Sequence, residues 1–257
     1  MNRLRGKAVL ITGGGSGIGA ATARLVCAEG GRAMLVDANA DTLAKTAKAI
    51  ADEIPKAQVA TFIGDVANAG QAVQAIERAV EEFGQIDVLV NNASMRNYSA
   101  LAEATPAEWQ AVVQVNLIGV ANYCRAALPV LRNRPGASIV NVSSAYASVG
   151  RKGMGLYDAT KAGVLAMTRT LAFEEAAHGV RVNAVSPGST LTEFHVGRAE
   201  AAGKSVEVLK AERQTTSLLA RWATPQEIAW PIIWLASDEA SFITGTTLMV
   251  DGGLSIM

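Results

Sequence analysis

The stretch that decides the fold is LITGGGSGIGAATA, residues 10–23. A β-branched run over 7–12 leads into three spaced glycines, and an alanine-rich helical pattern begins at residue 17. Glycines let the backbone approach a diphosphate closely, and the N–H groups and dipole at a helix N-terminus favour anions. The order of strand, turn and helix predicts a dinucleotide-binding unit, although glycine spacing alone also fits a plain turn. The residues we place at the cofactor here are Gly13, Ser16, Gly17, Ile18 and Gly19.

An acidic residue, Asp37, ends the next predicted strand, 18 positions after Gly19. Its carboxylate can accept hydrogen bonds from the diol of an adenosine ribose and would repel a 2′-phosphate. No Lys or Arg occurs at 14–16 or 38–40 to attract such a phosphate. We therefore expect NAD(H) rather than NADP(H). The alternative is an aspartate that only caps the following helix.

The rest of the chain alternates short apolar runs with alanine-rich helical patterns. Continuously apolar strands separated by helices indicate a parallel sheet covered on both faces. No linker or repeat divides the 257 residues, so we predict one α/β domain over 1–257. The polar segment 189–224 is either a substrate-binding lid or an ordinary surface excursion. Strands are predicted at 7–12, 32–37, 57–65, 86–93, 137–144, 180–188 and 246–253, and helices at 17–30, 40–53, 69–84, 106–132 and 155–178.

Composition excludes several classes of protein. Half of the residues are hydrophobic, far more than a disordered chain carries. Lys plus Arg balances Asp plus Glu at 23 each, without the basic stripe of a nucleic-acid binder. Cys27 and Cys124 have no metal-type spacing, so we expect no metal and two buried, reduced thiols. No apolar run approaches 18 residues and the N-terminal one is short, so we expect a soluble, cytoplasmic protein with no membrane partner.

The stretch GLYDATKAG, residues 155–163, places Tyr157 and Lys161 four positions apart, on the same face of a helix. A free tyrosine titrates near pH ~10, too high for a base at neutral pH. An ammonium ~4 Å away at an effective dielectric of ~20 contributes about 4 kcal/mol, which corresponds to roughly three pKa units. The pair can therefore act as an acid/base in a desolvated cleft. Taken alone, the stretch also fits a surface pair.

Two further polar residues stand out in apolar surroundings. Ser144 ends the fifth predicted strand, where parallel sheets carry ligand groups, and its hydroxyl could hold a substrate oxygen. Asn116 lies within VVQVNLIGV, residues 112–120, and a buried amide must find partners. It is either a satisfied core amide or part of the site.

Together these motifs resemble those of the short-chain dehydrogenase/reductase family. The matching segments run in order through nearly the whole chain, and the family is implied to form a seven-stranded Rossmann sheet in one domain, assembled as a homotetramer or dimer. The segments are residues 12–19, GDV at 64–66, NNA at 91–93, Asn116, VSS at 142–144, Tyr157 to Lys161, PG at 187–188 and VDGG at 250–253.

The resemblance implies a role for each catalytic candidate. Tyr157 would be the acid/base, and Lys161 would favour its phenolate and bind the ribose. Ser144, thirteen residues before Tyr157, would polarise the substrate oxygen, which leaves Ser143 as a structural hydroxyl. Asn116 would hold a water that links Lys161 to solvent.

Further cofactor contacts follow from the same resemblance. Asp65 and Val66 would contact the adenine, and the segment with Asn91, Asn92 and Ala93 would lie beside the ribose. The loop that grips the carboxamide would contain Pro187, Gly188, Thr190 and Thr192. The chain departs from the family pattern at Ser94, where glycine is usual, and at Thr190, where isoleucine or valine is usual.

The function implied is hydride transfer between NAD(H) and a secondary alcohol or ketone, such as a sugar, polyol, cyclic diol or hydroxy acid. The alternatives are a 3-oxoacyl thioester reductase and a non-catalytic dinucleotide-binding regulatory protein. Arg96, Arg151, Lys152 and His195 hint at an anionic substrate, although we interpret Arg96 as a solvated loop charge.

Overall fold

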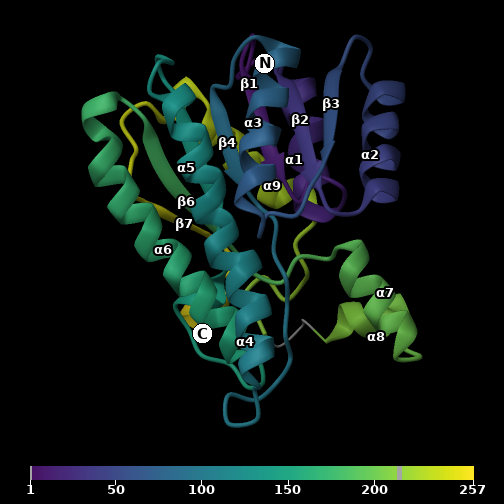
Figure 1. Cartoon of the computed structure of the whole chain (residues 1–257). Coiled ribbons are helices and arrows are strands. Elements are labelled where there is room, and N and C mark those ends of the chain that lie inside the picture. The colour runs from purple at the N-terminus through teal and green to yellow at the C-terminus, as the bar shows by residue number, and fades with distance from the viewer. Residues whose placement is uncertain (1, 213–215) are drawn as a thin grey trace.

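Strand β1, Ala8–Thr12, is an interior strand of a seven-stranded sheet in which all strands are parallel (Figure 1). The computed structural model describes residues 2–212 and 216–257. The strand order is β3-β2-β1-β4-β5-β6-β7. The predicted single α/β domain with seven parallel strands is confirmed. The other strands are β2 Arg32–Asp37, β3 Gln58–Ile63, β4 Val88–Asn91, β5 Ser138–Val142, β6 Arg181–Pro187 and β7 Thr247–Val250.

Several strands end earlier than predicted. The strands predicted at 57–65, 86–93 and 137–144 each extend two residues beyond the last residue of the observed strand. Those extra residues are not part of the paired strands, and they belong to loops at the carboxyl edge of the sheet. Ile11 of β1 and Val90 of β4 are paired next to this edge. The loops after parallel strands therefore meet at one edge, as ligand-binding loops do in open sheets.

Helices connect the strands, and their bounds are α1 Gly17–Ala28, α2 Ala40–Glu53, α3 Ala69–Phe83, α4 Pro106–Val113, α5 Gly119–Leu131, α6 Gly155–Glu175, α7 Glu193–Ala201, α8 Val206–Ala211 and α9 Pro225–Ala236. The helix predicted over 106–132 is interrupted by a π-helical turn, Gln114–Ile118. The one predicted over 155–178 ends at Glu175 and continues as a 3₁₀ turn, Ala176–His178. Helix α9 was missed by the sequence analysis, and it contains Pro231.

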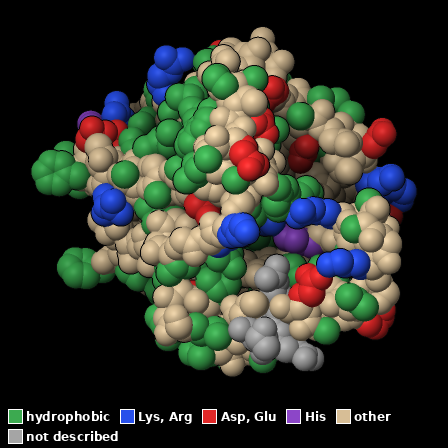
Figure 2. All heavy atoms as spheres, turned by 90° about the horizontal axis from the view of Figure 1, so that it is seen from below, with side chains coloured by type: hydrophobic (Ala, Val, Ile, Leu, Met, Phe, Trp, Pro, Cys, Tyr) green, Lys and Arg blue, Asp and Glu red, His purple; other side chains and the backbone are tan. Residues whose placement is uncertain are grey.

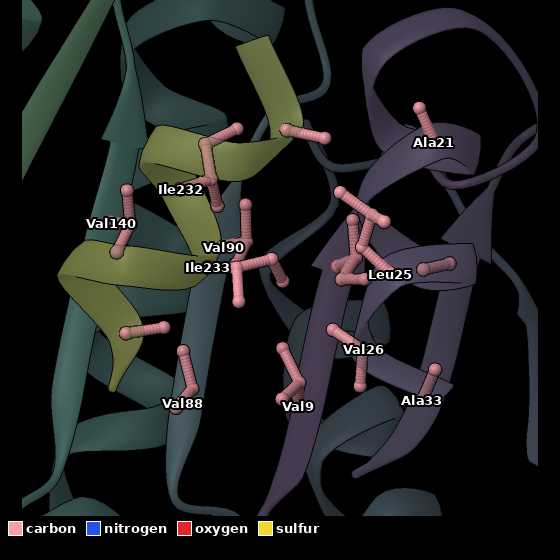
Figure 3. Close-up of a cluster of buried hydrophobic side chains, with 14 of the residues drawn as sticks. Val9, Ala21, Leu25, Val26, Ala33, Val88, Val90, Val140, Ile232 and Ile233 are labelled. Carbon is pink, nitrogen blue, oxygen red and sulfur yellow. The ribbon is translucent and has the colours of Figure 1, made fainter. Parts of the chain in front are cut away.

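Helices α1, α2 and α9 cover one face of the sheet, and α3, α5 and α6 cover the other. Alternate strand residues serve the two layers, because successive side chains of a strand point to opposite faces. Val9 and Val90 face α1 and α9, whereas Leu10 and Leu89 face the other layer. Figure 3 shows Ile232 and Ile233 of α9 in this first layer, with Leu25 and Val26 of α1 beside Val9.

The connection from β6 to β7 has the opposite hand to its neighbours. The β5-to-β6 and β6-to-β7 connections run in the same direction across the sheet, yet α6 lies on one face and α9 on the other. Nearly all parallel crossovers share one hand. The segment with α7 and α8 lies between β6 and α9, and it carries the chain around the carboxyl edge of the sheet (Figure 1).

The segment 189–224 forms a small unit at that edge. Ala199, Leu209 and Trp222 are buried together, and the Trp222 indole donates a hydrogen bond to the carbonyl of Leu209 at 2.9 Å. The segment is therefore helical and packed, as a surface excursion would be, while its role as a lid remains a prediction. Residues 213–215 of the predicted segment lie outside the described residues.

Among the residues that the structure describes, one helical stretch is long and apolar enough to cross a membrane, by length and composition alone. It is Pro106–Leu131, which covers α4, the π turn and α5. Tyr123, Ala127 and Leu131 of this stretch are buried in the layer that covers the sheet. Core helices of globular domains pass the same test, so this stretch is weak support for a membrane span.

Candidate active site

A cleft of about 610 Å³ opens at the carboxyl ends of β1, β4, β5 and β6. It is lined by every residue that the sequence placed at the cofactor except Gly19 and Asn91, and by Ser144, Tyr157 and Lys161 of the catalytic candidates. Asn116 and Lys152 do not line it. The lining residues named from the sequence as cofactor contacts are Gly13, Ser16, Gly17, Ile18, Asp37, Asp65, Val66, Asn92, Ala93, Pro187, Gly188, Thr190 and Thr192.

The glycine turn is a cradle that side chains would fill. Gly13 and Gly17 have φ of 64° and 52°, in the left-handed region that favours glycine. A Cβ at Gly13 would lie 2.8 Å from Cα of Ala93, and one at Gly19 would collide with the carbonyl oxygen of Gly13. A Cβ at Gly188, on the opposite rim, would likewise lie 2.7 Å from Cα of Asp251. The cradle therefore fits the diphosphate of a dinucleotide at the N-terminus of α1.

Side chains tie the glycine turn to the end of β4. The hydroxyl of Thr12 accepts hydrogen bonds from the backbone N–H groups of Asn92 and Ala93 at 3.0 and 3.1 Å. The Asn92 amide donates in return to the carbonyls of Thr12 and Gly13, both at 3.0 Å. Asn91 points into the core, where it donates to Asn141 at 2.9 Å. The loop after β4 is thus fixed against the glycine turn.

Asp37 lies at the end of β2, at the rim of the cleft. Its two carboxylate oxygens accept hydrogen bonds from the backbone of Gly15 and Asn39, both at 3.0 Å. The helix-capping alternative is wrong, because Asn39 is the N-cap of α2 and accepts from the N–H of Thr42. Asp37 instead presents a fixed negative charge beside the glycine turn.

Tyr157 and Lys161 lie on the first two turns of α6, and both are buried at 6% and 2% exposure. The surface-pair alternative is therefore wrong. The Lys161 ammonium lies 5.6 Å from the centroid of the Tyr157 ring and donates to the carbonyl of Val142 at 2.8 Å. Burial, together with the positive charge of Arg96, lowers the pKa of Lys161 to about 7. The pair is therefore the desolvated phenol and amine that acid/base chemistry requires.

The two serines after β5 have different partners. The Ser143 hydroxyl donates to the carbonyl of Lys161 at 2.8 Å, which is the structural role expected for it. The Ser144 oxygen accepts from the N–H of Tyr146 at 3.2 Å, at the start of a 3₁₀ turn. Within the described part of the chain its O–H has no protein acceptor, so it can donate to an oxygen in the cleft.

Asn116 sits in the π-helical turn and is fully buried. Its side chain accepts from the N–H of Met95 at 2.7 Å and donates to the Met95 carbonyl at 2.9 Å. Its second amide hydrogen goes to the hydroxyl of Thr160 at 3.1 Å. The amide is satisfied, and it fixes the loop after β4 directly before Arg96.

Arg96 is not the solvated charge that the sequence suggested. It lines the cleft, and its guanidinium lies 5.6 Å from the Tyr157 ring and 5.3 Å from the Phe194 ring. It donates to Nε2 of His195 at 2.7 Å. Because a guanidinium has only donors, Nε2 must accept, so His195 is neutral and its Nδ1 hydrogen is directed at Thr192 Oγ1, 2.9 Å away.

The other predicted cations lie in different surroundings. Arg151 lines the cleft, lies 3.7 Å from the Tyr146 ring centroid and binds Asp158 through two nitrogens, at 2.8 and 3.2 Å. Lys152 is exposed. Figure 2 shows Lys and Arg side chains beside a histidine on the face seen from below, where α7 and α8 lie.

Thr190 and Ser94 differ from the residues that are usual in the family, and both line the cleft. Thr190 is buried, donates to the carbonyl of Gly188 at 3.3 Å and pairs with Ala223. Ser94, where the family has glycine, is exposed and lines the cleft.

Sequence reasoning missed Glu193, Phe194 and Tyr146. The Glu193 carboxylate accepts from the N–H of Gly17 at 3.0 Å, at the N-terminus of α1. The rings of Phe194 and Tyr146 stack on Arg96 and Arg151. The contacts of Glu193 and Phe194 join segments far apart in the sequence, so no local pattern marks them. Tyr146 and Arg151 lie five positions apart in the connection between β5 and α6.

The arrangement is that of a dinucleotide-binding oxidoreductase fold with a buried Tyr–Lys pair in its cleft. A family model described as enoyl-(acyl carrier protein) reductase matches residues 13–255. The chain belongs to the short-chain dehydrogenase/reductase family, whose members bind a nicotinamide dinucleotide.

Relatives of the chain share its full length. A 3-oxoacyl-[acyl-carrier-protein] reductase from Thermotoga maritima is 38% identical, over 99% of this chain and 100% of the relative. A cis-4-hydroxycyclohexanecarboxylate dehydrogenase from Sinomonas cyclohexanicum is 41% identical, over 96% of each. An NADPH-bound short chain oxidoreductase from Pseudomonas aeruginosa, which has an atypical catalytic center, is 33% identical with a TM-score of 0.93, over 99% of this chain and 98% of that one.

Proposed function

We propose that the chain transfers a hydride between NAD(H) and a secondary alcohol or ketone of a small substrate. The observation that carries the proposal is the burial of Tyr157 and Lys161 in the same cleft as the glycine cradle, with Ser144 beside them. When bound, the nicotinamide dinucleotide supplies or accepts the hydride. The chain's own residues bind the substrate oxygen and move its proton.

In the oxidative direction, the Tyr157 phenolate accepts the proton of the substrate hydroxyl, and the Ser144 O–H donates to the same oxygen. Lys161 binds the ribose and favours the phenolate. We also propose that Asn116 holds a relay water. Both of its amide hydrogens are engaged, so a water there would bind to its remaining acceptor sites.

The preference for NAD(H) over NADP(H) is part of the proposal. It rests on the fixed carboxylate of Asp37 and on the lack of Lys or Arg at 14–16 and 38–40. A structural relative binds NADPH, so the choice depends on residues at this rim rather than on the fold.

A second candidate is reduction of a 3-oxoacyl thioester, favoured by the relative from Thermotoga maritima. This reaction would use the same four catalytic residues. Turnover of acetoacetyl-CoA, a 3-oxoacyl thioester, would distinguish this activity from oxidation or reduction of a small alcohol or ketone. A non-catalytic regulatory role is disfavoured, because Asn116, Ser144, Tyr157 and Lys161 are all present.

We further propose that 189–224 is a lid and that the protein is a cytoplasmic homotetramer without nucleic-acid or membrane partners. Thr192, Phe194 and His195 of the segment line the cleft, which supports the lid. Phe173 on α6 is 87% exposed, and Phe242, Ile256 and Met257 are exposed as well, which supports an interface between copies.

The test is Tyr157→Phe, assayed at the nicotinamide absorbance with a panel of secondary alcohols and ketones. We expect NADH binding, followed by fluorescence, to be unchanged and turnover to fall about 10²- to 10⁴-fold. Tyr123→Phe is the matched control, since the Tyr123 hydroxyl is buried outside the cleft. Retained turnover in Tyr157→Phe would refute the assignment.

A further inference from the structure

The part of the cleft beside Tyr157 holds the guanidinium of Arg96, which forms no salt bridge with any carboxylate in the described part of the chain. Within residues 2–212 and 216–257, Arg96 forms no ion pair, and its polar partner His195 is neutral. Asp158 is close enough to feel its charge, but both carboxylate oxygens accept from Arg151. Glu193 is bound to the backbone of Gly17. A partly buried cation without a counter-ion is costly, unless a ligand supplies the opposite charge.

The guanidinium of Arg96 is also held in place. The rings of Tyr157 and Phe194 flank it at 5.6 and 5.3 Å, and Asn116 fixes the backbone of the preceding residue. One of its five N–H donors goes to His195, which leaves others for a second acceptor. A planar guanidinium with free donors matches a carboxylate, which it can bind through two hydrogen bonds.

From this geometry we propose that Arg96 binds a carboxylate of the substrate, so that the protein acts on hydroxy acids or oxo acids. The inference rests on the proposed function, because it places the carboxylate beside the carbon whose oxygen Tyr157 serves. Arg96 contacts the Tyr157 ring, so the carboxylate and the reacting carbon are only a few bonds apart.

The same proximity argues against a thioester carrier as the origin of the charge. The phosphates of coenzyme A or a carrier protein lie a full pantetheine arm away from the oxo group. A cation that recognised them would stand at the mouth of the cleft, whereas Arg96 lies against the acid/base residue. The anion that Arg96 meets therefore belongs to the substrate itself.

The first arm of the test compares turnover of 4-hydroxycyclohexanecarboxylate with that of its methyl ester. We expect the wild type to prefer the carboxylate. Arg96→Met should lower kcat/KM for the carboxylate about 10- to 100-fold more than it lowers kcat/KM for the ester. Arg198→Met is the matched control, because Arg198 also stacks on a ring, that of Tyr98, but does not line the cleft.

The second arm measures binding without chemistry. Cyclohexanecarboxylate, which has no hydroxyl, is titrated calorimetrically into the protein with bound dinucleotide, beside cyclohexanecarboxamide. The carboxylate should bind the wild type, and Arg96→Met should lose that binding. Equal binding to both proteins would overturn the inference, as would equal losses of kcat/KM for the acid and the ester.

The two arms separate the two proposals. If uncharged alcohols are oxidised as well as the acid and cyclohexanecarboxylate does not bind, the inference fails while the proposed function stands. If no alcohol or ketone reacts but the carboxylate binds through Arg96, the proposed function fails and the anion site stands.

Discussion

The carboxylate of Glu193 accepts a hydrogen bond from the N–H of Gly17 at 3.0 Å, across 176 positions of sequence. This N–H lies at the N-terminus of α1, where the helix dipole favours an anion. Glu193 begins α7, so the first turn of the proposed lid occupies a position that a diphosphate would take. A diphosphate bound at the proposed place would therefore compete with the carboxylate of Glu193.

Glu193→Gln should consequently bind NADH more tightly, by about 3- to 10-fold, because a neutral amide competes less well for the helix N-terminus. Fluorescence titration with NADH measures the dissociation constant. Glu200→Gln, on the exposed side of the same helix, should leave it unchanged. Weaker binding in Glu193→Gln would mean that the carboxylate closes the lid over the cofactor rather than competing with it.

Asp37→Asn should shift the cofactor preference toward NADPH by about tenfold or more, since it removes the negative charge that meets a 2′-phosphate. The amide oxygen can still accept one of the two backbone hydrogen bonds from Gly15 and Asn39. The ratio of dissociation constants for NADH and NADPH is the measurement. Asp41→Asn, on α2, is the control for a general charge effect. A wild type that binds NADPH more tightly than NADH would contradict the proposed preference.

The depressed pKa of Lys161 predicts a pH dependence of stability in the dinucleotide-free protein. Its pKa is about 7 in the folded protein and about 10.5 in the unfolded chain, so between these values the unfolded chain binds the extra proton. Stability from this group therefore rises with pH from about 7 toward 10.5, by an amount on the order of a few kcal/mol.

Urea unfolding of the wild type and Lys161→Met at pH 7 and pH 9.5 measures this effect. The free energy of unfolding of the wild type should rise relative to that of Lys161→Met at the higher pH. Parallel behaviour of the two proteins would show that Lys161 keeps its proton in the folded cleft.

Gly19→Ala should destabilise the protein by at least about 2 kcal/mol, because its Cβ meets the carbonyl oxygen of Gly13. Gly197→Ala makes the same substitution in α7, where a Cβ would meet nothing within 4 Å. That variant should be unchanged or stabilised by about 0.5–1 kcal/mol. Chemical denaturation compares the two, and a Gly19→Ala protein as stable as the wild type would refute the close approach.

The sequence predicted the strands and the glycine turn because local patterns determine them. Apolar runs mark β1 to β7, and the spacing of Gly13 to Gly19 requires a close backbone approach. The side of the sheet that α9 covers could not be predicted. The usual rule for crossovers gives the other face, and the segment with α7 and α8 overrides it.

The site was predicted where the residues follow strand ends and missed where distant loops meet. Asp37 is the last residue of β2, and Ser144 comes two residues after the end of β5. The surroundings of Arg96 come from His195, 99 positions away, and from the Phe194 ring. The burial of Arg96 and its contact with His195 depend on how α7 packs over the cleft. The spacing of residues near Arg96 in the sequence does not predict this packing.

The π turn at Gln114–Ile118 makes the length of this helical stretch important for the site. A π turn holds one more residue than the α-helical turn it replaces, so it marks the site of a one-residue insertion. Removing one residue there would leave a continuous α-helix and would remove the wider turn that carries Asn116. Asn116 would then no longer face Met95. The length of this segment, and not only its composition, is therefore part of what shapes the substrate end of the cleft.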